Sequence, residues 1–297
     1  MSRARIAAHL ILGPREEPFL GALLASLEDA AESVIVNDNA PGASPHAATL
    51  AQSAFAKRGA LIVDRSPFVD FSTARNVCLR VHRERDAGEW VAFVDADEVH
   101  GEAITRIAGH LDRVPAHVGH VDGYTWHFFQ SPDWYTSIER RMAFFRFGAD
   151  VRWEGRVHEQ LRGVQGGRVA LPYVYGHYGH VLTPRRHAEK GRLYSSLGQS
   201  GAIVAADALD AIDPAAYFAD KWPILLAFHG AHPPAALPVI ARLRGELAGQ
   251  FARATALVRA HQPFPRRVRN LLEKANYEMR WRGRALSPLA RELTGAR

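Results

Sequence analysis

Three acidic residues follow an apolar stretch about a third of the way along the sequence. The run WVAFVDADE places Asp95, Asp97 and Glu98 directly after a segment that resembles a fully buried strand. Carboxylates at positions i and i+2 of a chain leaving a strand can present one group to a ribose hydroxyl and the other to a divalent cation, which prefers oxygen ligands. The alternative is an acidic first turn of a helix. Because the run follows the fourth strand of a series, the ligand-binding interpretation is favoured.

Polar side chains also follow two earlier predicted strands. Asn37-Asp38-Asn39 comes after the second strand, and Asp64-Arg65 comes after the third. Ligands of open α/β sheets bind beyond the carboxyl ends of the strands, so these residues are expected to face a ligand. Asp38 also suits an ordinary turn, since Pro-Gly follows shortly after it.

Further candidates lie downstream of these turns. Arg75, on a predicted helix, has the planar fork that suits a phosphate or a base edge, or it is a solvated helix residue. His158-Glu159 suggests a zinc protease helix, but HEQLR lacks the second histidine at i+4, which excludes that class. His177 and His180 fit one metal ligand with a neighbour, and they also fit ordinary packing; His177 is preferred because it lies nearer the predicted strand end.

The elements that position these residues alternate in the first hundred residues, as βαβ units of a parallel sheet do. The predicted strands are Ile6–Leu12, Val34–Asn37, Ala60–Val63 and Trp90–Val94. The predicted helices are Glu16–Leu27 and Ser72–Arg83, the latter with Ser72 as its N-cap.

The pattern changes after this region. Gly123–Phe147 is aromatic and strand-like, Glu154–Arg162 is predicted to be a turn into a short helix, and Val169–Tyr175 is a further strand. Beyond about Pro184 the chain is rich in Ala, Leu and Arg, which predicts helices broken by proline.

Composition limits the class of protein. The 297 residues are 47% hydrophobic, which is enough for a sizeable core, and they contain no apolar run long enough to span a bilayer. The single cysteine, Cys78, cannot form an internal disulfide, so a cytoplasmic location is expected.

The net charge of +6 resides in the C-terminal part of the chain. Residues 241–297 hold 13 Lys and Arg against four Asp and Glu, a net of +9, which leaves −3 for residues 1–240. No zinc-finger, RNP or basic-zipper pattern accompanies the basic tail, so no nucleic-acid partner is expected. Arginines interleaved with Leu271, Leu272 and Trp281 instead suggest peripheral contact with an anionic membrane, at its inner face.

Several enzyme classes are excluded by missing motifs. The sequence has no Walker A loop, no G-x-G-x-x-G after the first strand and no G-x-S-x-G. Kinase, dehydrogenase and serine hydrolase functions are therefore not expected.

Taken in order, the motifs between Arg5 and Val181 resemble those of family 2 glycosyltransferases with the GT-A fold. They are PREE with Pro14, VIVNDNAPGAS with Asp38, DFSTARN with Asp70 and Arg75, VDADE, WEGRVHE from Trp153 to Glu159, and HYGH from His177 to His180. The resemblance implies an α/β fold with a Rossmann-like mixed central sheet flanked by helices. It also implies a GT-A domain over residues 1–183, with a nucleotide-binding half at 1–100 and an acceptor and metal half at 101–183. A helical, basic extension follows at 184–297.

The same resemblance implies inverting, metal-dependent transfer of a sugar from a nucleotide sugar, with a UDP-sugar favoured, to a glycan, lipid-linked, peptide or small-molecule acceptor. It assigns the donor to Asp38, Arg75, Asp95, Pro14 and Asp70, Mn²⁺ or Mg²⁺ to Asp97 and His177, and the catalytic base to Glu159. His158, His180, Trp153 and Lys190 are further candidates, and His158 is an alternative base. Arg185, Arg186 and Lys190 are expected to close over the phosphates. A metal-dependent hydrolase using Asp95, Asp97, His158 and His177, or a noncatalytic nucleotide-sugar-binding protein, are the alternatives.

Overall fold

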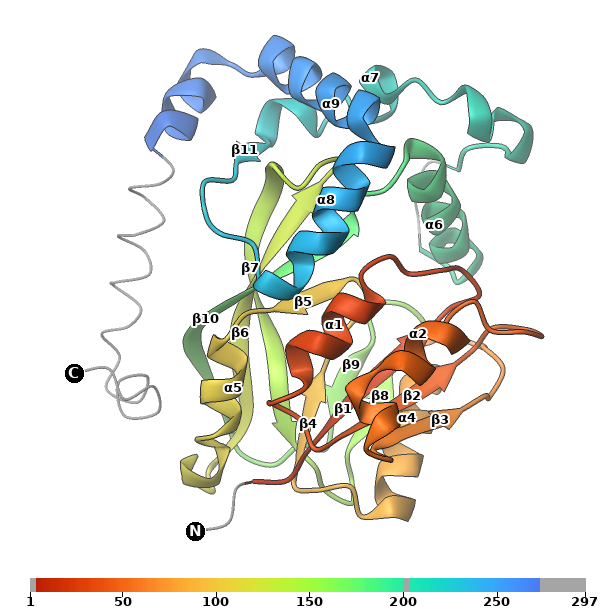
Figure 1. Cartoon of the computed structure of the whole chain (residues 1–297), viewed down its shortest axis with the longest axis vertical. Helices are drawn as coiled ribbons and strands as arrows, with labels where there is room; N and C mark the ends of the chain where they lie inside the picture. The colour runs from red at the N-terminus through yellow and green to blue at the C-terminus, as the bar shows by residue number, and fades with distance from the viewer. Residues whose placement is uncertain (1–3, 200–202, 273–297) are drawn as a thin grey trace.

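The computed structural model describes residues 4–199 and 203–272. Its centre is a nine-stranded mixed sheet in the order β3-β2-β1-β4-β7-β6-β10-β5, with β11 added beside β7 (Figure 1). The strands are β1 (Ile6–Leu12), β2 (Ser33–Asp38), β3 (Leu61–Asp64), β4 (Trp90–Phe93), β5 (Glu98–His100), β6 (Val118–Phe129), β7 (Trp134–Arg146), β10 (Gly167–His180) and β11 (Leu226–Ala227).

The first four strands form the parallel half of the sheet. β1 lies between β2 and β4 and is parallel to both, and β2 is parallel to β3. β1, β2 and β4 are almost entirely buried because helices cover both faces, which explains their continuous apolar sequences. The carboxyl ends of β1, β2, β3 and β4 therefore meet at one edge.

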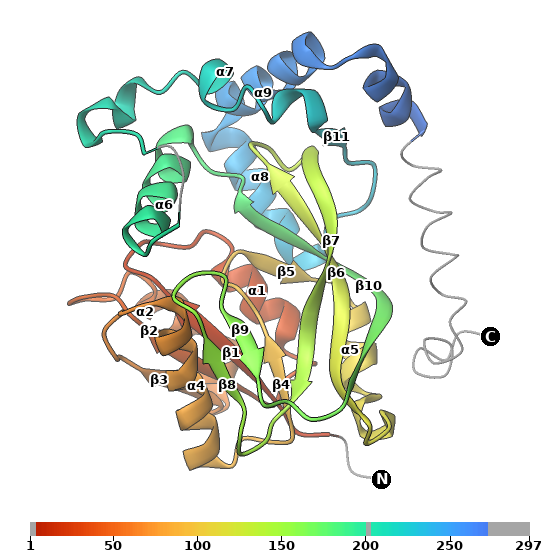
Figure 2. The same ribbon diagram turned by 180° about the vertical axis from the view of Figure 1, so that it is seen from behind.

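Helices lie on both faces of this half. α1 (Leu20–Leu27), α2 (Ala47–Gln52) and α5 (Ala103–Ala108) lie on the face seen in Figure 1, and α4 (Phe71–Arg85) lies on the face seen in Figure 2. Alternate residues of β1 supply the two cores: Ala8 and Leu10 pack in the α1 cluster, and Ala7 packs in the α4 cluster with Cys78.

Two predicted helix starts were misplaced. α4 begins at Phe71, and its N-cap is Asp70, whose side chain accepts a hydrogen bond from the Thr73 N–H, so the predicted cap at Ser72 is wrong. α1 begins at Leu20 and not at Glu16. Glu16 and Glu17 belong to the loop after β1, where Glu16 is exposed and Glu17 is half-buried.

The predicted short helix over Glu154–Arg162 is wrong as well. This segment contains an antiparallel hairpin of β8 (Arg152–Glu154) and β9 (Gln160–Arg162). Gly155 and His158 in its loop have positive φ angles of 101° and 55°, which break a helix and turn the chain back on itself. Two hydrogen bonds between Asn76 of α4 and the backbone of Trp153 hold the hairpin against α4.

The second half of the sheet is mainly antiparallel. β7 pairs antiparallel with β4 and β6, while β10 pairs parallel with β6 and antiparallel with β5. β6 and β10 approach closely: a Cβ atom added at Gly123 would lie 2.4 Å from the Tyr173 ring. This half carries the aromatic sequence, and its strands pair directly with the parallel half through β4 and β7.

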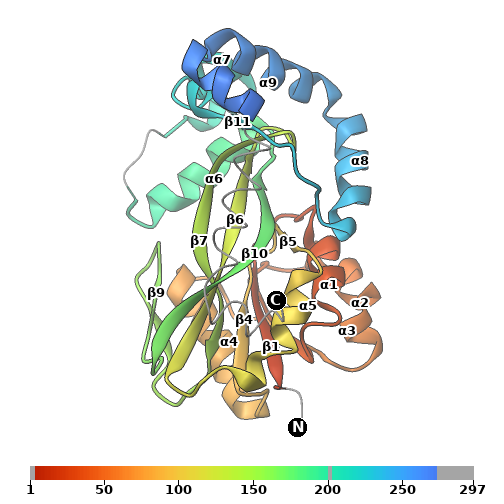
Figure 3. The same cartoon turned by 90° about the vertical axis from the view of Figure 1, so that its left-hand side faces the viewer.

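The described residues beyond β10, 181–199 and 203–272, are mostly helical and cross the end of the sheet (Figure 3). Its elements are α6 (Pro184–Ser196), α7 (Pro214–Tyr217), α8 (Leu237–Glu246) and α9 (Ala248–His261), and the short helix α3 (Ala54–Lys57) lies earlier in the chain. Short 3₁₀ helices occur at Leu111–Arg113, Ala206–Ala211, Trp222–Ile224 and Pro234–Ala236. Phe19 and Ala22 share a core cluster with Ile240 and Leu243, so this extension packs on the first half of the chain.

A last helical segment covers residues 264–272. Phe264 and Leu271 are 78% and 84% exposed on it. The predicted membrane-facing residue Trp281 lies outside the described residues. Within residues 4–199 and 203–272, no helix combines the length and the apolar character needed to cross a bilayer.

The predicted fold is confirmed in its class, its mixed central sheet flanked by helices and its helical C-terminal portion. This is the arrangement expected of a GT-A-like fold. The parallel half and the α6 segment frame the cavity described next.

Candidate functional site

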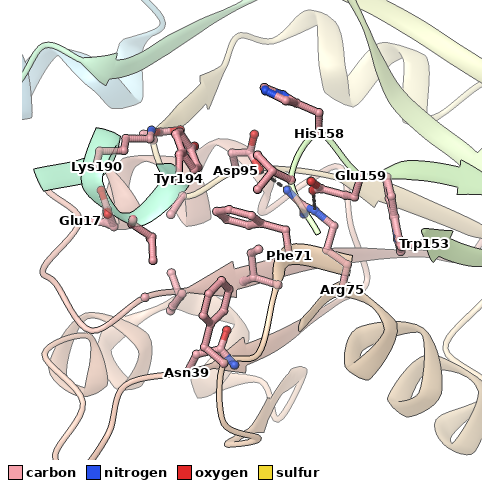
Figure 4. Close-up of a pocket in the computed structure, with 18 of the residues that line it drawn as sticks. Glu17, Asn39, Phe71, Arg75, Asp95, Trp153, His158, Glu159, Lys190 and Tyr194 are labelled. Atoms are coloured by element: carbon pink, nitrogen blue, oxygen red, sulfur yellow. Dashed lines mark hydrogen bonds and ion pairs between the residues drawn. The ribbon is translucent and has the colours of Figure 1, made fainter. Parts of the chain in front are cut away.

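A cavity of about 1530 Å³ opens at the carboxyl ends of the parallel strands. Its wall contains residues from the loops after β1, β2, β3 and β4, from the β8–β9 hairpin, from β6, β7 and β10, and from α6 (Figure 4). Eight Arg and Lys side chains line it, against five Asp and Glu. The cavity is therefore suited to an anionic ligand.

The loops after β1 and β2 form one end of the cavity. Pro14 lines it, as predicted for a donor-facing turn, and so does Asn39. Asp38 is buried, does not belong to the lining residues, and accepts a hydrogen bond from the Ala40 N–H at 3.2 Å. Asp70 caps α4 and is also outside the lining set. Both carboxylates therefore accept hydrogen bonds from nearby backbone N–H groups and do not face the cavity.

Arg75 lies at the base of the cavity between two carboxylates (Figure 4). Its Nη2 is 2.6 Å from Asp95 Oδ1, and its Nε is 2.5 Å from Glu159 Oε1. The guanidinium also lies 4.2 Å from the centre of the Phe93 ring. With only 7% of its side chain exposed, Arg75 joins three elements: α4, the loop after β4 and the hairpin loop.

Asp95 and Glu98 share a second arginine. Arg141 of β7 donates to Asp95 Oδ2 at 2.9 Å and to Glu98 Oε1 at 3.0 Å. Burial alone would raise the pKa of Asp95, but Arg75 and Arg141 outweigh it and hold that pKa well below its ordinary range. Burial raises the pKa of Glu98 to about 8, against the opposing effect of Arg141. Both oxygens of Asp95 are thus paired with arginines.

Asp97 forms a separate corner of the cavity. Its Oδ1 is 3.3 Å from His177 Nε2, and its Oδ2 is 3.6 Å from Lys190 Nζ. Burial would raise the pKa of Asp97, but His177 and Lys190 outweigh it and lower that pKa. Gly179 packs against the carboxylate so closely that an added Cβ atom would lie 2.0 Å from Oδ2.

The predicted metal ligands Asp97 and His177 therefore do meet. Asp97 Oδ1 is buried and has no hydrogen-bond partner. The 3.3 Å separation from His177 Nε2 matches that of neighbouring ligands around a six-coordinate cation with bonds of about 2.1 Å, which lie about 3 Å apart. Among residues 4–199 and 203–272, no group of three or more His, Cys, Asp or Glu side chains has metal-binding geometry. The pair fits a cation that takes its other ligands from a bound substrate or water.

Helix α6 forms the wall above this corner. Its N-cap, Thr183, accepts from the Arg186 N–H, and Arg186 Nη2 donates to the Glu16 carbonyl at 2.7 Å. Tyr194 lies 5.5 Å from Phe71, centre to centre, across the cavity. Arg186, Lys190 and Tyr194 line the cavity, whereas Arg185 is exposed and pairs with Glu189 and Asp210. The predicted cluster of basic residues is thus divided between the two sides of α6.

The β8–β9 hairpin supplies the opposite wall. Trp153, His158 and Glu159 line the cavity. Glu159 is 12% exposed and lies in the loop before β9, so the expected support from a helix start is absent. The positive φ angle of His158 is the backbone feature that turns its neighbour Glu159 toward Arg75.

Sequence reasoning missed several lining residues. Arg141, His127 and Glu139 come from long strands, and His127 Nε2 lies 3.4 Å from Glu139 Oε2. His127 is paired with His177 across β6 and β10, which places their rings 4.8 Å apart. The one available signal was the charged pair Arg140-Arg141 within an otherwise strand-like run.

Glu17 was also missed. Burial, and then the nearby carboxylate of Asp97, raise the pKa of Glu17 to about 7 against the opposing effects of Arg186 and Lys190. It lines the cavity near α6 (Figure 4). Its place in the loop after β1 explains its burial, because the predicted helix would have left it on an exposed first turn.

Comparison with known proteins gives similarity at the level of structure. No family model matches the sequence, and no curated protein matches it significantly. A mannosyltransferase from Pyrobaculum calidifontis, solved with GDP-Man and Mn²⁺, is 17% identical, with a TM-score of 0.42 over 99% of this chain and 84% of that chain. GalNAc-T7 with UDP, GalNAc and Mn²⁺ is 9% identical, with a TM-score of 0.35 over 57% and 30%. A mycobacterial protein is 16% identical, with a TM-score of 0.29 over 41% of each chain.

Proposed function

We propose that the protein is a glycosyltransferase that moves a sugar from a nucleotide-sugar donor to an acceptor hydroxyl with inversion. The observation that carries this proposal is one cavity, at the carboxyl ends of parallel strands, where an excess of cations converges with the Asp97–His177 pair. A nucleoside diphosphate linked to a sugar has both the charge and the length to occupy it. The order of motifs in the sequence supports the same function.

The donor's base and ribose would lie against the loops after β1 and β2, next to Pro14 and Asn39. Asp95 would offer a lone pair to a ribose hydroxyl while Arg75 and Arg141 hold it in place. Lys190 and Arg186 would donate hydrogen bonds to the diphosphate from α6. Positive charge already in place at this wall stabilises the diphosphate as it leaves.

Asp97 and His177 would hold Mn²⁺ or Mg²⁺. When bound, such a cation would neutralise charge on the donor's diphosphate. His177 is suited to this role because burial lowers its pKa and leaves the imidazole neutral, with Asp97 opposing that shift.

Glu159 would accept the proton of the acceptor hydroxyl. As that proton moves to a Glu159 oxygen, the acceptor oxygen forms a bond to C1 of the sugar, and the bond from C1 to the diphosphate breaks on the opposite face. The products are a glycoside of inverted configuration, a nucleoside diphosphate and protonated Glu159. Arg75 keeps the carboxylate pointing into the cavity through its bond to Oε1.

Calorimetry of nucleotide binding tests the donor and metal assignments. UDP, GDP and dTDP are titrated with Mn²⁺ and with EDTA, and UDP is expected to bind more tightly with Mn²⁺. Asp97→Asn should remove most of that difference, whereas Asp220→Asn, at a side chain that is 70% exposed, should preserve it. Equal affinity with Mn²⁺ and EDTA would contradict the metal assignment, and no binding of any nucleotide would contradict the donor class.

Single-turnover transfer at saturating donor tests the base. Glu159→Gln should slow transfer by about 10²–10⁴-fold, the usual contribution of a positioned base, with donor binding retained. Glu154→Gln is the matched control, since its side chain is 48% exposed on the same hairpin. His158→Ala should have the smaller effect if Glu159 is the base. Product analysis separates transfer from hydrolysis, because water would take the sugar in a hydrolase.

A further inference from the structure

Lys190 occupies the place beside Asp97 that an added cation would approach. Its Nζ is 3.6 Å from Oδ2, while His177 Nε2 is 3.3 Å from Oδ1, so both oxygens of the carboxylate already face a nitrogen. The Lys190 side chain is 30% exposed, and that of Asp97 is 15% exposed. An ammonium in this enclosed corner repels any second cation at Asp97.

Contacts with the loop after β1 hold helix α6, which carries Lys190, beside the cavity. α6 is tied to the loop after β1 by the Arg186 bond to the Glu16 carbonyl and by an ion pair of 3.1 Å between Arg15 and Glu189. On the other side, the Asp97 carboxylate packs against Gly179, where an added Cβ atom would lie 2.0 Å from Oδ2. The fold therefore places the backbone of Lys190 near Asp97, while the ammonium at the end of its flexible side chain can change partners.

We propose that Lys190 is the resident cation of this corner: it keeps a divalent ion out of the nucleotide-free protein, and a diphosphate admits the ion by drawing Lys190 onto its own oxygens. The second half of this proposal rests on the proposed function. The first half concerns the free protein alone and can be measured without any nucleotide. The expected order of binding is thus nucleotide before, or together with, the metal ion.

Electron paramagnetic resonance of Mn²⁺ measures this directly, because the signal of the free ion falls when it binds. Without nucleotide, Lys190→Met should bind Mn²⁺ at least about tenfold more tightly than the wild type, since the competing charge is gone. Arg185→Met is the matched control: it removes the same charge from the exposed face of α6, where the side chain is 53% exposed. It should bind Mn²⁺ as weakly as the wild type.

A double variant locates the ion. Adding His177→Ala to Lys190→Met should abolish the gained Mn²⁺ binding. Adding UDP to the wild type, with UDP and Mn²⁺ alone as the blank, should raise Mn²⁺ binding more than it does in Lys190→Met. Lys190→Gln provides a second uncharged side chain in case the methionine variant folds poorly.

Three results would overturn the proposal. They are tight Mn²⁺ binding by the nucleotide-free wild type, no gain in either Lys190 variant, and a gain that survives His177→Ala. A failure of the proposed function shows itself differently: UDP would change nothing in any variant, while the nucleotide-free measurements would still decide the role of Lys190.

Discussion

The two aspartates of the acidic motif, Asp95 and Asp97, lie in different surroundings. Asp95 belongs to a closed network, in which Arg75 and Arg141 link it to Glu159 and Glu98 through contacts of 2.5–3.0 Å. Asp97, two residues later, has contacts of 3.3 and 3.6 Å, and its Oδ1 has no hydrogen-bond partner.

This difference separates a carboxylate that is fixed in position from one that can exchange its contacts. Arginines hold both oxygens of Asp95, so the Asp95 network fixes the strand end, the hairpin and β7 relative to one another, and each oxygen keeps a lone pair for a further hydrogen bond. A carboxylate with longer contacts can exchange them for a ligand at little cost. The motif thus combines Asp95, whose contacts are fixed, with Asp97, whose contacts can be exchanged for a ligand.

The largest expected effect follows from breaking the closed network. Arg75→Met should lower the free energy of unfolding by about 3–5 kcal/mol, because it leaves Glu159 without its arginine and Asp95 with Arg141 alone. Urea denaturation measures the change. Arg80→Met on the same helix is the control, and it should cost less than about 1 kcal/mol because its side chain is 47% exposed. A loss as small as the control's would mean that the network is not a support.

The second prediction concerns pH and uses His100, which lies on β5 two residues beyond Glu98. Burial lowers the pKa of His100 to about 3. The folded state keeps it neutral while the unfolded chain binds a proton below about pH 6.5, so its stabilising contribution is present above pH 6.5 and is lost as pH falls. Between pH 6.5 and 5, stability should fall less steeply in His100→Phe than in the wild type, by a difference that grows to about 1.4 kcal/mol per pH unit near pH 5.

Urea denaturation at several pH values checks this slope difference. Groups that titrate in both proteins cancel in the comparison, including Glu98, whose raised pKa gives the opposite dependence. Parallel slopes would show that His100 is not kept neutral by the fold.

A third prediction uses Glu17 to test the corner of the cavity around Asp97. Because the pKa of Glu17 is raised to about 7, it is neutral below that pH and adds a negative charge beside Asp97 above it. UDP affinity should therefore fall a few-fold in the wild type, relative to Glu17→Gln, as pH rises from 6 to 8. Calorimetry of both proteins at each pH isolates this effect, since ionisation of the nucleotide is common to both. If the ratio of the UDP affinities of the two proteins is the same at pH 6 and pH 8, the charge of Glu17 does not affect UDP binding.

The smallest expected effect concerns a surface outside the cavity. Phe264, Leu271 and Leu272 are exposed on the basic segment 264–272, and we expect weak sedimentation with anionic vesicles that disappears at high salt. Leu271→Asp should weaken it, while Val69→Asp, at another exposed apolar residue, should not. Equal sedimentation with neutral vesicles would contradict an electrostatic contribution.

Features that depend on neighbouring residues could be predicted from the sequence, whereas most features that depend on residues far apart in the sequence could not. The parallel half followed from local periodicity, because strands buried on both faces are continuously apolar. The meeting of Asp97 with His177 was anticipated from motif order. The β8–β9 hairpin was not, because its strands are three residues each and depend on Asn76 of α4 for support.

The different roles of Asp95 and Asp97 could not be predicted from the sequence either, because they depend on contacts between distant residues. Arg141 is 46 residues from Asp95 along the chain, and nothing near either residue indicates the contact. The sequence resemblance assigned Glu159 as the base without indicating that Arg75, 84 residues away, holds one of its oxygens. Long-range pairing of charges decides which carboxylates remain available, and such pairing leaves no local pattern.

Gly179 gives the corner a vulnerability of a different kind. It offers a ligand no side chain, yet every other amino acid would push a carbon atom into the carboxylate of Asp97. In a library of all single substitutions selected for activity, position 179 should therefore be as intolerant as Asp97 itself, and alanine should fare little better than leucine. A search for functional positions based on side-chain chemistry would overlook it, whereas a genetic screen would find it among the first.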